Sequence, residues 1–117
     1  MIPWISPEIV DQVLEIGVER APREACGLIT PDSKVVELPN SSKEPYKSYD
    51  ITTEDLVNAL NSYIARTHDG HFGPEQVVVW HTHPNGQIGP SQGDMQLKAE
   101  RFRYLVVSIP GGQAVQF

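Results

Sequence analysis

The chain has 117 residues, of which 39% are hydrophobic and 21% are charged, a balance that suits a folded protein and excludes a disordered one. This length is enough to bury an apolar core, so we expect residues 1–117 to form a single domain. The formal net charge of −6, with no cluster of Lys and Arg, excludes nucleic acid as an expected partner.

The first expected element is a helix that begins at Ser6 and ends near Arg20. Residues 1–4, which precede it, have neither the basic stretch nor the apolar run of a signal peptide. No apolar run in the chain is long enough to span a bilayer, so we expect a cytoplasmic protein outside the membrane.

The start of this first helix is indicated by Ser6, which supplies a capping hydroxyl, and by Pro7, which suits the first helical turn. Apolar residues then follow at helical spacing and predict one apolar, buried face: Ile9, Val10, Val13, Leu14, Gly17 and Val18.

Two short apolar runs after this helix predict a β-hairpin. The first run, residues 25–30, ends at Pro31-Asp32, and the second covers residues 34–38. Cys26 lies in the first run, where a buried thiol is expected, and as the only cysteine it excludes an intrachain disulfide. Residues 39–49 are rich in Ser, Asn, Pro and Lys and are predicted to form an ordered loop.

A second helix is predicted to begin at Thr52. Its apolar residues are expected on a buried face: Leu56, Val57, Leu60, Tyr63 and Ile64. Residues 68–74 contain two glycines and a proline and are predicted to form a loop. Residues 76–80 are nearly all apolar, which is typical of a strand covered on both faces.

The last part of the chain predicts a helix and two strands. Ser91 opens the third helix, where Asp94 completes a capping box. Residues 103–109 form another apolar strand, and residues 113–117 can pair back after a turn. The whole order predicts one α/β domain, a mixed β-sheet with flanking helices.

Two histidines stand where the apolar strand ends, just before Pro84. Alternate residues of a strand face the same side, so His81 and His83 present two imidazoles together. Asp94, in the first turn of the third helix, can add a carboxylate. Two neutral imidazoles and a carboxylate suit Zn²⁺, and three protein ligands leave the fourth tetrahedral position open, as in catalytic sites. The sequence therefore predicts one catalytic zinc ion.

A zinc hydrolase also needs a general base and a donor for the oxyanion. Glu24, just before an apolar strand, is the candidate base, and Ser91 is the candidate oxyanion donor. Simpler explanations exist: Glu24 alone would be a solvated acid, and Ser91 with Asp94 forms a helix cap, although both roles can hold together. His68 and His71 are interpreted as a solvated loop and not as a second metal pair, because no third ligand follows them.

Taken together, these residues resemble the signature of the JAMM (MPN+) zinc metallopeptidase family. That signature is an upstream Glu, then His-x-His-Pro, six residues, and Ser-x-x-Asp. The chain matches it without a gap, at Glu24, His81-Thr82-His83-Pro84, residues 85–90 and Ser91-Gln92-Gly93-Asp94. The resemblance implies that His81, His83 and Asp94 bind zinc. It also implies that Glu24 is the general acid/base and that Ser91 stabilises the oxyanion.

The fold implied by this resemblance is a cytidine-deaminase-like α/β sandwich, and the implied activity is hydrolysis of a peptide or isopeptide bond. The short chain and the run Glu-Ala-Cys-Gly-Leu resemble small bacterial homologues and the domain of bacteriophage tail-tip assembly proteins. The expected partner is a protein or peptide substrate, such as a ubiquitin-like or phage tail protein, in a bacterial or infected cytosol or on the virion. A non-catalytic MPN-type scaffold module remains the alternative, although no metal ligand is lost. A zinc-dependent deaminase in its usual form is excluded by the single cysteine.

Overall fold

The structure is a computed structural model that describes residues 5–98 and 101–117. The expectation about a signal peptide concerns residues 1–4, which lie outside the described residues. The elements follow in the order α1 (Pro7–Arg20), β1 (Cys26–Ile29), β2 (Val35–Leu38), α2 (Thr53–Thr67), a short 3₁₀ helix η1 (Pro74–Gln76), β3 (Val78–His83), α3 (Gln92–Leu97), β4 (Arg103–Ser108) and β5 (Ala114–Gln116). This order confirms the helices and strands predicted from the sequence.

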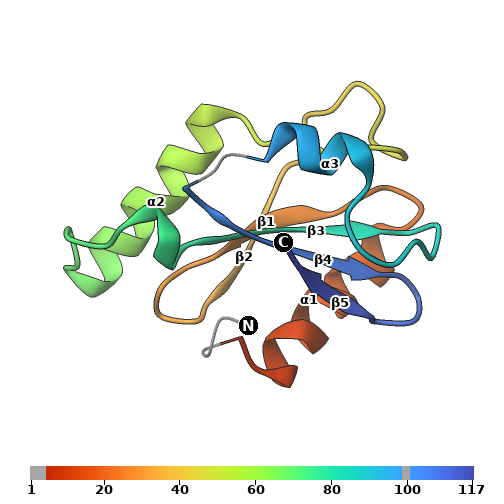
Figure 1. The fold of residues 1–117 in the computed structure, drawn as a ribbon. Helices are drawn as coiled ribbons and strands as arrows, with labels where there is room; N and C mark the ends of the chain where they lie inside the picture. Colours follow the sequence, from red (N-terminus) through yellow and green to blue (C-terminus); the bar gives the residue numbers. More distant parts are fainter. Residues whose placement is uncertain (1–4, 99–100) are drawn as a thin grey trace.

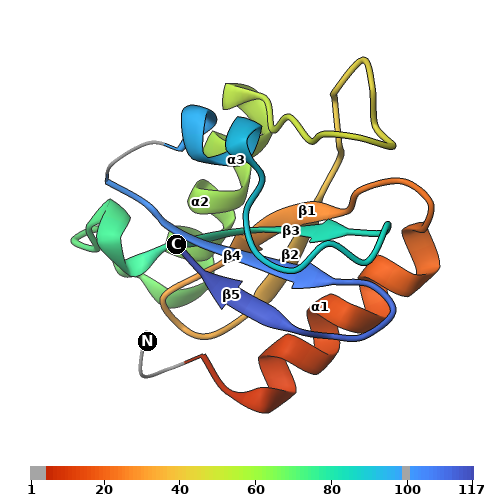
Figure 2. The same ribbon diagram turned by 45° about the vertical axis from the view of Figure 1, so that its right-hand side comes forward.

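The strands form one mixed sheet with helices on both faces. Their order is β2-β1-β3-β4-β5, with β3 and β4 parallel and the other neighbours antiparallel. α1 covers one face of the sheet, and α2 and α3 lie over the other (Figures 1 and 2). The α/β class with a mixed sheet and flanking helices is therefore confirmed.

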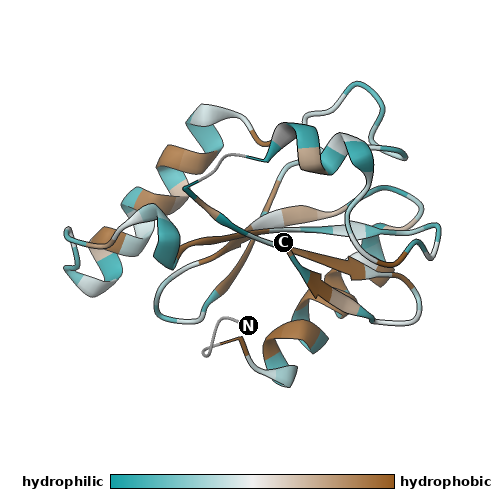
Figure 3. Cartoon of the chain, viewed as in Figure 1, coloured by the Kyte–Doolittle hydropathy of each residue, from teal (hydrophilic) through white to brown (hydrophobic). Residues whose placement is uncertain are grey.

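Alternation along the strands divides the apolar residues into two cores. On the α1 side, Val78 and Trp80 of β3 pack with Ile9 and Val13 of α1. On the α2 side, Val79 packs with Leu28 of β1 and with partly buried residues of α2. Figure 3 shows the same pattern as mostly hydrophobic strands between helices in which hydrophobic and hydrophilic residues alternate. β3 is buried along its whole length, as expected for a strand covered on both faces.

Four details of the predicted elements are wrong. Val18, Val57 and Ile64 were expected on buried helix faces, but they are 55%, 45% and 36% exposed. The residues that α2 buries fully or partly form a narrower stripe, Leu56, Ala59, Leu60 and Tyr63, at i, i+3, i+4 and i+7, and the first three pack against the core on this side of the sheet. The strand predicted from residue 76 begins at Val78, because Gln76 belongs to η1.

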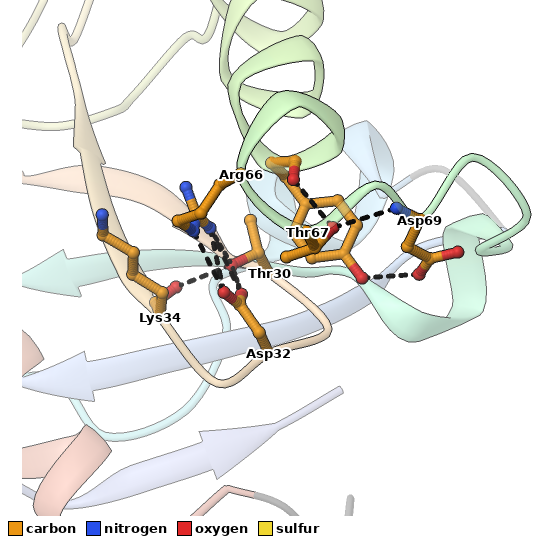
Figure 4. A network of polar contacts seen from close by, with 7 residues as sticks. Thr30, Asp32, Lys34, Arg66, Thr67 and Asp69 are labelled. Carbon is orange, nitrogen blue, oxygen red and sulfur yellow. Dashed lines mark hydrogen bonds and ion pairs between the residues drawn. The ribbon is translucent and has the colours of Figure 1, made fainter.

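A polar network ties the β1–β2 turn to the C-terminal end of α2 (Figure 4). The guanidinium of Arg66 pairs with Asp32, with 3.1 Å between Nη2 and Oδ2. The hydroxyl of Thr30 donates to the same carboxylate and lies 3.3 Å from the carbonyl oxygen of Lys34. Arg66 and Asp32 are each about one-third exposed, so this pair orients the hairpin more than it stabilises the fold.

Among the described residues, no helix has the length and apolar character needed to cross a bilayer.

At Gly17, the backbone of α1 lies close to side chains of the sheet and of the residue that follows β4. A Cβ at this position would lie 2.6 Å from Cδ1 of Ile109 and 2.8 Å from Cγ2 of Thr82. Gly17→Ala is therefore expected to lower the free energy of unfolding by about 1–3 kcal/mol through overpacking. An exposed helical glycine would instead gain up to about 1 kcal/mol on the same change.

Urea denaturation of Gly17→Ala, with Gly70→Ala as the matched control, tests this expectation. A Cβ at Gly70 would meet nothing within 4 Å, so the control should be neutral or slightly stabilised. A Gly17→Ala protein as stable as wild type would contradict the tight contact between α1 and the sheet.

Candidate metal centre

The sheet register places both histidines and Glu24 on one face. In β3, Val79 lies in the core on the α2 side, so His81 and His83, two and four residues later, face the same side. β1 runs antiparallel to β3 with Cys26 opposite His81. Continuing that register by two residues sets Glu24 opposite His83. Cross-strand partners share a face, so the acid and both imidazoles meet where the strands end.

The side chains of His81, His83 and Asp94 converge on one point. The two Nε2 atoms are 3.2 Å apart, and each is 3.0 Å from Oδ2 of Asp94. All three residues are buried, with exposed fractions of 0%, 4% and 8%. These are the residues that the sequence singled out as ligands, brought together from β3 and the start of α3.

The geometry of these three atoms suits a tetrahedral metal ion. Ligand atoms about 2.0–2.1 Å from a tetrahedral zinc ion lie roughly 3.3 Å from one another, close to the observed spacings. Burial lowers the pKa of His81, which keeps its imidazole neutral, as a metal ligand requires. The Nδ1 atoms of His81 and His83 are buried without a hydrogen-bond partner, so the Nε2 atoms carry the polar contacts of both rings.

Asp94 is held by the capping box at the start of α3. The backbone N–H of Ser91 donates to Oδ2 of Asp94 at 2.8 Å, and the N–H of Asp94 donates to Oγ of Ser91 at 3.0 Å. Burial acts to raise the pKa of Asp94, but hydrogen bonds from His81 and Ser91 outweigh it, and the pKa lies well below its usual value. Asp94 is therefore a carboxylate at neutral pH. The Ser91 hydroxyl accepts from Asp94, so its own hydrogen remains available to donate.

Glu24 lies next to this triangle as a buried acid. It is 5% exposed, and its Oε1 atom has no hydrogen-bond partner. Glu24, His81 and His83 each offer a ligand atom, and these atoms lie within 4.8 Å of one another. Burial, and then the charge of Asp94, raises the pKa of Glu24 to about 8. A carboxyl group with a pKa near neutrality can both accept and donate a proton.

Tyr49 also contacts the centre, although no pattern in the sequence indicates this role. Its ring stacks on His81 with centroids 4.3 Å apart and planes inclined by 20°. The stacking restricts the plane of the His81 imidazole, whose Nδ1 has no hydrogen-bond partner among the described residues. Tyr49 is the last residue of the predicted loop, and a tyrosine in a polar segment carries no signal for such a contact.

Three other residues considered from the sequence lie apart from the chemistry. Cys26 is 0% exposed, and burial raises the pKa of its thiol to about 12, so it stays protonated and unreactive near neutral pH. Within the described residues, His68 and His71 belong to no group of three or more metal-ligating side chains. Their interpretation as loop residues is therefore consistent with the structure.

The raised pKa of Glu24 predicts a pH-dependent stability in the zinc-free protein. The pKa is about 8 in the folded state and near the ordinary 4.5 in the unfolded chain. Between these values the folded protein keeps a proton that the unfolded chain releases, so this contribution is complete below pH 4.5 and is lost as pH rises through 8. The variant Glu24→Gln removes this pH-dependent contribution to the free energy of unfolding. With zinc chelated, the variant should gain stability relative to wild type as pH rises.

Urea denaturation of both zinc-free proteins at about pH 5, 6.5 and 8 measures this difference. The histidines and Asp94 are common to both proteins, so the comparison isolates position 24. A constant difference in the free energy of unfolding across this range would show that Glu24 ionises normally in the folded state.

Comparisons with known proteins agree with this fold. A family model described as prokaryotic homologs of the JAB domain matches residues 6–117. No curated protein matches the chain. The solution structure of a protein from Salinibacter ruber is 23% identical, with a TM-score of 0.50, and the match covers 94% of this chain and 75% of that chain. This structural likeness supports the fold alone.

Proposed function

Since the chain belongs to the family of prokaryotic homologues of the JAB domain, we propose that it is a zinc-dependent hydrolase that cleaves a peptide or isopeptide bond. The observation that carries this proposal is the convergence of Nε2 of His81, Nε2 of His83 and Oδ2 of Asp94 within 3.0–3.2 Å of one another. These three residues are the proposed zinc ligands. A zinc ion held there would act as a Lewis acid and bring the pKa of a water molecule towards about 7.

Glu24 is the proposed general acid/base. Its carboxyl group lies beside the histidines, and Oε1 is free of protein hydrogen bonds. In this role it takes a proton from the attacking water and returns it to the nitrogen of the leaving amine. Its burial suits the second half of that task, because a carboxyl group shielded from bulk water keeps the proton until the nitrogen accepts it.

Ser91 is the proposed oxyanion donor. Its Oγ already accepts from the N–H of Asp94, so the hydroxyl is held in place and its hydrogen points elsewhere. As the carbonyl carbon becomes tetrahedral, this hydroxyl donates to the oxygen that gains charge. Its position one residue before α3 links it to the same helix that positions Asp94.

The substrate is proposed to be a protein or peptide in the cytoplasm, with a ubiquitin-like protein or a phage tail protein as the two candidates. The match to the prokaryotic family supports the enzyme class and leaves both substrates open. A non-catalytic scaffold is the competing function, but a buried acid with an unpaired oxygen beside the proposed ligands favours a hydrolase.

The test is to measure metal content and hydrolysis on the same purified protein. The chain should bind about one zinc ion and cleave some members of a panel of peptides and isopeptide-linked ubiquitin-like conjugates. Chelation should abolish cleavage, and one equivalent of zinc should restore it. A protein that binds no zinc with both histidines intact would refute the proposal, and zinc binding without cleavage of any substrate would support the scaffold.

A further inference from the structure

Residues 39–50 hold the backbone of Glu24 on both sides. The N–H of Glu24 donates to the carbonyl oxygen of Pro45 at 2.7 Å, and its own carbonyl accepts from Nδ2 of Asn40 at 3.0 Å. This segment lies on the same side of the sheet as α3 in both views (Figures 1 and 2). Glu24 precedes β1, which begins at Cys26. The two hydrogen bonds from the loop therefore hold its backbone as hydrogen bonds between strands would hold a residue within the sheet.

Asn40 is the centre of this arrangement, because its amide makes four hydrogen bonds. Nδ2 donates to the carbonyl oxygens of Glu24 and Ser48, both at 3.0 Å. Oδ1 accepts from the N–H groups of Ser42 at 3.0 Å and Asp50 at 3.1 Å. An asparagine side chain has two N–H donors and two acceptor lone pairs, so its capacity is fully used. One side chain therefore joins both ends of the loop to Glu24.

The carboxyl group of Glu24 is less firmly held than its backbone. Within the described part of the chain Oε1 makes no hydrogen bond, so the position of the carboxyl group depends strongly on where the backbone is held. The next residue, Ala25, is fixed to Thr82 of β3 by its N–H at 2.9 Å and its carbonyl oxygen at 3.0 Å. The backbone around Glu24 is thus held by β3 on one side, through Ala25, and by the loop on the other.

We propose that Asn40 is a positioning residue that holds Glu24 at the distance needed for proton transfer. This inference rests on the proposed function of Glu24 as the acid/base. The same loop ends at Tyr49, which stacks on His81, so it positions the acid/base and one proposed ligand together. Asn40 itself is not expected to touch the substrate or the metal.

Asn40→Asp tests the inference with a nearly isosteric change. Oδ1 keeps its two N–H donors, whereas the second oxygen replaces Nδ2 and faces the carbonyl oxygens of Glu24 and Ser48. Because small misplacement of a catalytic group can cost up to about 100-fold, kcat should fall by about 10- to 100-fold. KM should stay within about twofold, and zinc content should be unchanged. Asn61→Asp, the same change on the exposed side of α2, should match wild type in all three.

An activity-independent readout accompanies the kinetics. In ¹⁵N-labelled protein, the Glu24 amide should lose protection from hydrogen exchange in Asn40→Asp, while buried β4 amides such as that of Val106 keep theirs. Asn40→Ala, which removes the bonds without adding charge, should show the same loss if the aspartate variant folds poorly. Unchanged kcat, or unchanged protection at Glu24, would overturn the inference. If wild type cleaves nothing, the proposed function fails, and the exchange result still decides whether Asn40 holds Glu24.

Discussion

His83→Ala is expected to abolish zinc binding and, with it, hydrolysis. The variant removes one of the three atoms that lie within 3.0–3.2 Å of one another, and leaves His81 and Asp94 as a two-ligand site. Loss of residues that merely orient metal ligands weakens binding by about 10- to 100-fold, so loss of a ligand should weaken it by more than about 100-fold. His83 is the better target because His81 is stacked under Tyr49, where truncation would also leave a cavity.

Zinc affinity can be followed through stability as well as through metal content. A ligand that binds only the folded state stabilises it by about 2.7 kcal/mol at 100 times its Kd, so zinc should raise the thermal midpoint of wild type. The same addition should leave His83→Ala unchanged. His71→Ala is the matched control, since this exposed histidine lies outside the cluster and its removal should preserve the shift. A full zinc-dependent shift in His83→Ala would show that zinc binds elsewhere.

The positions of the proposed ligands could be predicted because they depend on local rules. Alternation along a strand directs His81 and His83 to one face, and a capping box fixes Asp94 in the first turn of a helix. The loop between His83 and Ser91 is short, so the helix must start near the end of the strand. Glu24 was predicted from its position just before an apolar strand and from the resemblance to the JAMM signature, whereas its place opposite His83 depends on the pairing of β1 with β3, which only the structure shows.

The support around these residues could not be predicted, because it comes from contacts between distant segments. Asn40 and Tyr49 lie in a polar loop, and their roles depend on how that loop folds back over Glu24 and His81. No periodicity marks a side chain that bonds to the backbone of a residue 16 positions away. The exposed Val57 of α2 has a similar cause, since helical spacing gives the direction of an apolar face but not the width that the sheet covers.

The buried acid in this centre lowers the stability of the fold, a cost that a purely structural site would avoid. Glu24 is 5% exposed with an unpaired Oε1, and a buried polar atom without a partner destabilises a fold by about 1–3 kcal/mol. The neighbouring Asp94 adds charge repulsion, which is one cause of the raised pKa. Such an arrangement is typical of a group held ready for proton transfer. The zinc-free Glu24→Gln protein is therefore informative about function as well as stability.

Glu24→Gln is expected to lower kcat by about 10²- to 10⁴-fold while the protein keeps its zinc. Glutamine has nearly the same shape but cannot take a proton from water or deliver one to a leaving amine. The proposed ligands His81, His83 and Asp94 are untouched, so metal content should stay at about one ion. Steady-state kinetics and metal analysis on the same sample measure both quantities. Glu15→Gln, on the exposed side of α1, is the matched control and should behave as wild type.

The result also separates two ways in which Glu24 can serve the centre. Its ligand atom lies within 4.8 Å of those of His81 and His83, so it is a possible metal ligand as well as a base. If Glu24→Gln loses zinc together with activity, Glu24 belongs to the ligand set, and the assignment of Asp94 as the third ligand needs testing by Asp94→Asn. If the variant keeps zinc and full activity, another group moves the proton. The acid/base role requires that the variant keep its zinc and lose most of its kcat, because an acid/base is needed for turnover but not for metal binding.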